Sequence, residues 1–154
     1  MVMTKLARPE MLARIKERTG FEGLEVYGMY DAVIEAEANT VEELHRKIND
    51  IDKMGLIRGT ETYIVARDGK KKEIRDVGTF AYILVDASPG DIDKVQTTLS
   101  EFKEVRKSDV LFGPFDIIVD VAVKNMDELN EVVRKIISME SVFKTCTLVS
   151  SKIH

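Results

Sequence analysis

The chain has 154 residues, 44% of them hydrophobic and 32% charged, which is the profile of a globular protein and excludes a disordered one. Its single cysteine excludes an internal disulfide, no apolar run approaches the roughly 18 residues of a membrane span, and no secretion signal is visible, so we expect a cytoplasmic protein. The net charge of −4 argues against a protein whose main task is to coat nucleic acid.

The first half of the chain predicts two helices and two strands. A helix is expected at about residues 9–18, and Gly20 ends it, because glycine is the usual residue just after a last helical turn. Residues 30–38 alternate in polarity, which predicts a strand even though alanine and glutamate also favour helix. An amphipathic helix follows at 41–51, and the segment 60–66 predicts a short strand.

The second half predicts a complete order of strands and helices. Strands are expected at 80–86, 105–112, 116–123 and 145–151, with helices that begin near 89 and 126. Pro89 occupies a first helical position, where its missing N–H costs nothing, and Gly113-Pro114 marks a hairpin turn. This order, β-α-β-β-α-β, is the ferredoxin-like pattern.

The chain also contains an internal repeat, because residues 26–65 match residues 111–150 without a gap. The shared positions include Gly28 and Gly113, Asp31 and Asp116, Thr60 and Thr145, Thr62 and Thr147, and the capping-box pairs Thr40–Glu43 and Asn125–Glu128. The second copy of the first strand, DIIVDVAV, is β-branched and therefore supports a strand at DAVIEAEA as well.

The predicted fold class is therefore α+β, with two ferredoxin-like (βαββαβ) modules of the dimeric α/β-barrel type at 1–77 and 78–154. The first module has little room for a strand before its first helix. The Asp-Gly pair at 68–69 signals a hairpin directly after the strand at 60–66, so residues 72–77 are predicted to double back. We hypothesise that 72–77 fill the missing first-strand position, as in a circular permutant.

The faces of the predicted sheet bear on assembly. Helices cover one face of such a sheet, yet the strand at 80–85 is apolar on both faces. The second face therefore needs a cover, and a sheet from the other half or from another chain would provide it. We expect a homo-oligomer, and a monomer with one mixed face is the alternative.

Residues 79–151 resemble the RAM domain, the ligand-sensing and oligomerisation half of the Lrp/AsnC transcription regulators. The motifs that carry the resemblance are FAYILVDASPGDIDKV, the helix NMDELNEVVRKI, the last strand TCTLVS and the turn G-x-[YF]-D, which occurs at 28–31 and 113–116. The resemblance implies a dimeric α/β barrel that assembles further, with amino-acid effectors bound between subunits. Other Lrp/AsnC regulators are then candidate partners.

The candidate ligand-binding residues lie at the two turns and on the last strand of each copy. They are Gly28, Tyr30, Asp31, Thr60 and Thr62 in the first copy and Gly113, Phe115, Asp116, Thr145 and Thr147 in the second. By resemblance the glycines admit the ligand backbone, the aspartates meet its α-ammonium group and the threonines line the pocket. Each also has a structural explanation: a positive φ for the glycines, turn N–H bonds for the aspartates and β propensity for the threonines.

We therefore predict a non-enzymatic sensor of a small effector, linked to transcription regulation, with no cofactor and no metal. Two histidines and one cysteine are too few for a typical structural zinc site, and no phosphate loop or dinucleotide fingerprint occurs. Direct DNA binding is not expected, since a strand at 30–38 would interrupt a helix-turn-helix domain. The alternatives are a complete DNA-binding regulator of the same family and an α/β-barrel enzyme.

Overall fold

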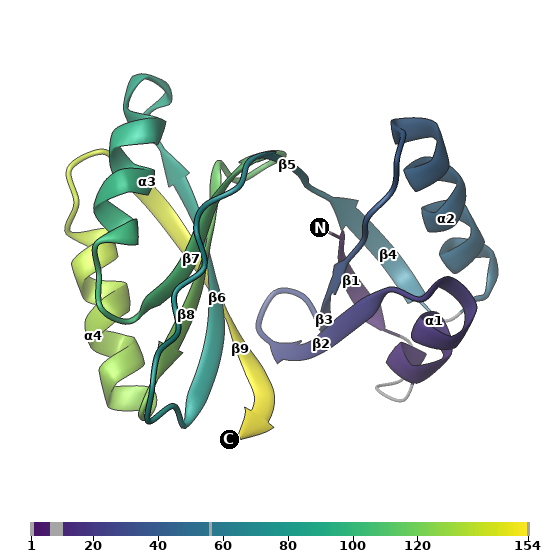
Figure 1. Cartoon of the computed structure of the whole chain (residues 1–154), viewed down its shortest axis with the longest axis horizontal. Helices are drawn as coiled ribbons and strands as arrows, with labels where there is room; N and C mark the ends of the chain where they lie inside the picture. The colour runs from purple at the N-terminus through teal and green to yellow at the C-terminus, as the bar shows by residue number, and fades with distance from the viewer. Residues whose placement is uncertain (1, 7–10, 56, 154) are drawn as a thin grey trace. The chain divides into compact units, whose positions relative to one another are not determined.

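The computed structural model describes residues 2–6, 11–55 and 57–153, with the backbone alone at 2, 4–6, 11, 57–60 and 151–153. The chain divides into two compact units, Met1–Tyr63 and Ile64–His154 (Figure 1). Each unit is an antiparallel sheet with two helices on one side. Within the described residues, no helix is long and apolar enough to cross a membrane.

The first unit is a complete ferredoxin-like module. Its elements are β1 (Val2–Leu6), α1 (Met11–Thr19), β2 (Glu22–Tyr27), β3 (Ala32–Glu35), α2 (Val41–Lys53) and β4 (Ile57–Thr62). The strands lie in the order β4-β1-β3-β2, and each neighbouring pair is antiparallel. Gly20 has a φ of +75° directly after α1, as the sequence predicted for a helix end.

Strand β1 occupies the position that the permutation hypothesis gave to residues 72–77. Met3 pairs with Val33 of β3 on one side and with Glu61 of β4 on the other. The hypothesis is wrong because it assumed that the residues before the first helix are too few for a strand. The five residues of β1 are enough, since they span about 17 Å. Residues 72–77 form no strand, and the N–H of Lys72 donates to the carbonyl of Arg106 at 2.7 Å.

The second unit repeats this module and adds one strand. Its elements are β5 (Ile64–Arg67), β6 (Thr79–Ala87), a 3-10 turn (Pro89–Asp91), α3 (Ile92–Ser100), β7 (Val105–Phe112), β8 (Ile117–Val123), α4 (Met126–Ile137) and β9 (Val142–Ile153). The strand order is β9-β6-β8-β7-β5, again antiparallel throughout. Strand β5 is an extra edge strand beside β7.

The segment between β5 and β6 lies along the second unit. The N–H of Gly69 donates to Oδ1 of Asp109 at 2.8 Å, so the Asp-Gly pair makes no hairpin here. A Cβ atom at Gly69 would collide with the carbonyl oxygen of Ser108, so this position requires glycine for close approach. The compact units therefore divide after Tyr63, whereas the sequence suggested a boundary after residue 77.

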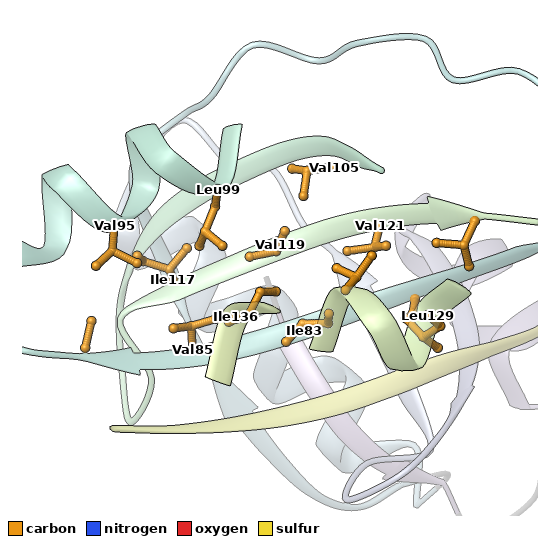
Figure 2. Packing of buried hydrophobic residues seen from close by; sticks show 14 residues of the cluster. Ile83, Val85, Val95, Leu99, Val105, Ile117, Val119, Val121, Leu129 and Ile136 are labelled. Atoms are coloured by element: carbon orange, nitrogen blue, oxygen red, sulfur yellow. The ribbon is translucent and has the colours of Figure 1, made fainter. Parts of the chain in front are cut away.

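The helices of the second unit pack on the inner face of its sheet (Figure 2). The central cluster combines Val95 and Leu99 of α3, Leu129 and Ile136 of α4, and Ile83, Val85, Ile117, Val119 and Val121 of the strands, all of them at most 2% exposed. The corresponding cluster of the first unit is smaller and contains Ile15, Phe21, Ala32, Ile34, Ile48 and Ile51. The amphipathic helix expected at 41–51 is confirmed as α2, although Val41 at its start is 63% exposed, and Met126 at the start of α4 is 48% exposed.

Both predicted capping boxes are present. The N–H groups of Glu43 and Glu128 donate to the side chains of Thr40 and Asn125, each at 3.0 Å. Each glutamate carboxylate reaches back to the N–H one residue before the cap, at 3.1 Å in α2 and 3.2 Å in α4. The bond from Asn39 and the nearby ammonium of Lys47 lower the pKa of Glu43. The internal repeat is therefore a repeat of hydrogen bonds as well as of residues.

Candidate functional site

The two G-x-[YF]-D turns connect β2 to β3 and β7 to β8. In the first unit the N–H of Val26 donates to the carbonyl of Asp31 at 2.9 Å, and in the second Leu111 donates in the same way to Asp116 at 2.8 Å. In the second unit this hairpin end lies beside the end of β6 and the start of β9. We name the residues gathered there, Asp86, Phe115, Asp116 and Lys144, the second rim.

The two turn glycines differ in backbone conformation. Gly28 has a φ of +146°, a value that residues other than glycine rarely adopt. The predicted role of this glycine in the turn is therefore confirmed. Gly113 has no positive φ, and for this residue the prediction is wrong. The reason is Pro114, because the residue before a proline is held in the extended region by clash with the proline ring.

The two aromatic residues of the turns are buried. Tyr30 is 8% exposed and Phe115 is 6% exposed, so each ring anchors its turn against the module. The ammonium of Lys144 lies 5.3 Å from the centre of the Phe115 ring, within the range of a cation–π contact. Phe115 therefore holds a positive charge at the second rim.

Asp116 links the second hairpin to the neighbouring strand. Its Oδ2 accepts from the N–H of Ala87 at 2.9 Å, and its own N–H donates to the carbonyl of Val85 at 2.9 Å. The structural explanation foresaw an aspartate that accepts N–H bonds from its own turn, and the observed donor is instead at the end of β6. One oxygen of this carboxylate is not used by that bond.

Asp86 is a residue that the sequence analysis missed. Its carboxyl group is a neighbour of that of Asp116, and both side chains are half-buried. Burial raises the pKa of Asp116 and the neighbouring Asp86 carboxyl raises it further, while the N–H of Ala87 opposes both effects. Lys144, also missed, pairs across the sheet with Asp86. Only the strand register shows these neighbours, because they are distant from the turn motif in sequence.

The threonines do not join the second rim. Thr145 pairs with Val85, a core residue, so it lies on the face that the helices cover, and Thr147 follows two residues later on the same face. Thr62 is exposed on the first unit, and the side chain of Thr60 lies outside the described residues. The structure therefore brings together the turn and strand-end residues and leaves the threonines apart.

Surface hollows also occur on the first unit, away from the two turns. The two larger ones, of about 550 and 480 Å³, are lined mainly by charged side chains of α1 and α2, among them Arg14, Arg18, Lys47 and Lys53. Such a lining lacks the apolar enclosure of a typical small-molecule site, and none of the predicted residues contributes to it. Among the described residues, no group of three His, Cys, Asp or Glu side chains could hold a metal ion.

Comparison with known proteins gives similarities of sequence and of fold. The HTH-type transcriptional regulator FL11 of Pyrococcus furiosus is 24% identical over 111 residues, which covers 72% of this chain and 70% of that protein. The solved structure of the siroheme decarboxylase NirDL covers 99% of this chain and 70% of its own, with 10% identity and a TM-score of 0.70. AsnC from E. coli covers 73% of each chain, with 18% identity and a TM-score of 0.48. The similarity to NirDL shows the fold alone.

The described elements thus define a protein of two ferredoxin-like modules, each with a G-x-[YF]-D hairpin. Residues 80–154 match the family model of the Lrp/AsnC ligand binding domain. The second module is thus the part of the chain that matches the Lrp/AsnC ligand binding domain, as the resemblance predicted.

Proposed function

We propose that this protein is a non-enzymatic sensor of a small effector, made of two RAM-like modules and linked to transcription regulation. The match of residues 80–154 to the Lrp/AsnC ligand binding domain supports this proposal, as does the name of the similar Pyrococcus protein, a transcriptional regulator. The observation that carries it is the second rim, where a carboxyl pair and an ammonium stand at the G-x-[YF]-D hairpin. The compartment we propose is the cytoplasm.

The second rim has the charges that a free amino acid needs. The carboxylates of Asp86 and Asp116 accept hydrogen bonds from an α-ammonium group, and charge-assisted bonds of this kind are among the stronger ones in proteins. The ammonium of Lys144 is available to an α-carboxylate on the same edge of the sheet. An amino acid is therefore the effector class that we propose.

The remaining turn residues complete the proposed sites. Gly113 and Gly28 leave room beside the hairpin for the backbone of a ligand, and Phe115 and Tyr30 fix the turns from inside. Asp31 takes the place of Asp116 in the first module. The predicted threonines would reach a ligand only across the strand edge. They are Thr60, Thr62, Thr145 and Thr147.

Assembly is the proposed output of ligand binding. Leu84, Ile118 and Leu148 lie on the sheet face opposite the helices of the second unit, as alternation along the strands dictates, and each is at most 3% exposed within the single chain. These side chains therefore need no cover from another chain, and we propose a homo-oligomer, or assembly with a related regulator, on the match to the Lrp/AsnC ligand binding domain instead. A ligand that binds one assembly state more tightly than another shifts the population of that state.

Direct DNA binding is not part of the proposal. The described residues of the first unit form a four-stranded sheet with two helices, and a helix-turn-helix domain would require three successive helices there. The protein would thus act on transcription through a partner that reads DNA. The enzyme alternative has a likeness of fold in its favour, for instance to NirDL, and a shared fold does not imply a shared reaction.

A thermal-shift assay with the twenty common L-amino acids, each tested alone, examines this proposal. A ligand of the native state must raise the melting temperature. We expect a rise with at least one amino acid, and a much smaller rise in the Asp116→Asn variant, which keeps an acceptor for Ala87 but loses the charge. Glu131→Gln, an exposed change in the middle of α4, is the matched control. No rise with any amino acid would refute the proposal.

A further inference from the structure

The two larger hollows of the first module adjoin each other along α1 and α2. These helices pack beside each other (Figure 1), and both hollows include Arg18 and Met54. We give the name basic hollow to the residues that line them: Arg14, Glu17, Arg18, Thr19, Lys47, Asp50, Lys53 and Met54. Four cations face two carboxylates in this lining, an excess of two positive charges on a chain whose net charge is −4.

Three of the four cations are available to a ligand. The ammonium of Lys47 lies 3.3 Å from Oε1 of Glu43 and contributes to an ion pair on α2. Within the described part of the chain, no carboxylate lies within ion-pair distance of Arg14, Arg18 or Lys53, and all three residues are exposed. Their charges are therefore not neutralised by the protein itself.

The ends of the two helices explain these cations only in part. Arg18 and Lys53 lie in the last turns of α1 and α2, where a positive charge is favourable to the helix dipole. Arg14 lies further back in α1, and the effect of the dipole falls off within the last turn. The dipole also does not require that cations from two helices line one hollow.

The second module shows that the fold does not require the cations of α2. The internal repeat places Val132 at the position of Lys47 and Ser138 at the position of Lys53. Val132 is fully buried in the central cluster of the second module. An apolar residue and an uncharged residue therefore serve the same fold in α4, so the cations of the first module point to a separate task.

The positive stretch of this surface is short. A third hollow shares Thr19 and Lys47 with the basic hollow and is lined by Glu22, Glu35 and Glu37. A long polyanion such as nucleic acid would meet these carboxylates if it continued past Lys47. A small anion avoids them, and the volumes of about 550 and 480 Å³ lie in the range of small-molecule sites.

We infer that the basic hollow binds the phosphoryl group of a small molecule, whether inorganic phosphate or a phosphate ester. The guanidinium groups of Arg14 and Arg18 can donate paired hydrogen bonds to phosphoryl oxygens, and Lys53 adds a third cation. A phosphoryl group carries close to two negative charges at pH 7, which matches the excess charge of the lining. The residues of the second rim take no part, so this site is additional to the proposed effector site.

Nuclear magnetic resonance on the full chain, labelled with nitrogen-15, tests the inference. The probes are inorganic phosphate, pyrophosphate and adenosine 5′-monophosphate, with adenosine and acetate as controls that lack a phosphoryl group. We expect saturable shifts of the amide signals of Arg18, Thr19 and Met54 with the phosphorylated probes, at a Kd of about 1 mM or below. Tighter binding of the monophosphate than of phosphate would identify an ester as the ligand, and the reverse would identify free phosphate. Equal shifts with acetate or adenosine, or no shift with any phosphorylated probe, would overturn the inference.

Two variants at exposed positions separate the basic hollow from general surface charge. Arg18→Gln and Lys53→Gln should each weaken binding about tenfold, because each removes a charge-assisted bond. Arg46→Gln is the matched control, since it removes an exposed cation of α2 that does not line the hollow. Circular dichroism checks that each variant is folded. An equal loss in the control, or tighter binding of a short DNA duplex at the same residues, would refute a site for a small phosphorylated molecule.

Discussion

The two modules have the same backbone fold. They differ in the number of apolar side chains that they bury and in the charged residues at their hairpin ends. Equivalent hydrogen bonds recur in both at the turns and helix starts, for instance Val26 to Asp31 and Leu111 to Asp116. These bonds satisfy backbone groups that would otherwise be unpaired, so their side-chain partners change little between copies. The charged side chains at the strand ends do not satisfy backbone groups, so they can differ between the copies. The comparison teaches that the repeat preserves the scaffold, while the chemistry of the site has diverged.

The cores also differ, and the difference predicts unequal stability. The second unit buries fourteen side chains in its central cluster, and the described part of the first unit buries six. Burial of apolar area is the main favourable term in folding, so we expect the first unit to unfold before the second. The matched positions of the repeat allow this difference to be measured with pairs of variants.

The largest effect is expected from truncation of the apolar side chains with which the helices pack on the sheets. Leu129→Ala removes a side chain that is 1% exposed and should destabilise the second unit by about 2–5 kcal/mol, because it leaves a cavity in a packed core. Leu44→Ala, its counterpart, removes a half-buried side chain and should cost clearly less. Urea unfolding followed by circular dichroism measures both. Equal costs would show that the two cores are packed alike.

The turn glycines should give the next largest difference. Gly28→Ala places a side chain where φ is +146°, and a strained backbone of this kind costs roughly 1–3 kcal/mol. Gly113→Ala changes a residue without a positive φ and should be nearly neutral. Thermal unfolding of the two variants gives the comparison. A cost at Gly113 as large as that at Gly28 would contradict the assigned backbone conformations.

Much of the scaffold was predictable because its causes are local. The caps at Thr40 and Asn125, the helix end at Gly20 and the strand from Val105 to Phe112 each follow from residues close in the chain. The repeat also identified a strand at β3 that helix propensity alone would have missed. The short strand β1 was overlooked because its pairing with β3 and β4 depends on residues distant in sequence.

The candidate site was predictable only in part, for the same physical reason. The turn motif located Asp116 and Phe115, since a hairpin end can be read from a few adjacent residues. Asp86 and Lys144 join them through strand register, and register is not visible along one strand. The threonines were placed in the site by their repetition, yet alternation along β9 puts Thr145 on the helix-covered face. A prediction of register would have supplied the missing half of the rim.

The capping boxes offer a smaller test in which the two modules should agree. Thr40→Ala and Asn125→Ala each remove the acceptor for one N–H in the first turn of a helix, and each should cost about 1 kcal/mol. Equal losses, measured by urea unfolding of each unit's transition, would confirm that the scaffold is energetically repeated. A loss in one module alone would show that the caps have diverged along with the charges.

The smallest effect is expected from removal of the carboxyl repulsion at the second rim. The pKa of Asp116 is raised in the folded protein, first by burial and then by Asp86, so the native state holds more protons than the unfolded state between the ordinary and the raised value. Stability from this group is therefore present at low pH and is lost as pH rises through the raised pKa.

Asp86→Asn should reduce this loss of stability. The free energy of unfolding of the variant should therefore rise relative to that of the wild type as the pH rises from about 4 to 7. The rise in Tm should be below the roughly 4 °C that 1 kcal/mol gives a domain of this size. Asp120→Asn provides the opposite sign, because Asp120 forms a two-pronged ion pair with Arg106, with contacts of 2.9 Å to both oxygens, and its charge stabilises the sheet at neutral pH. A loss of stability at pH 7 in Asp86→Asn would contradict this prediction. It would show that the negative charge of Asp86 stabilises the folded protein, as an attraction to a cation such as Lys144 would cause.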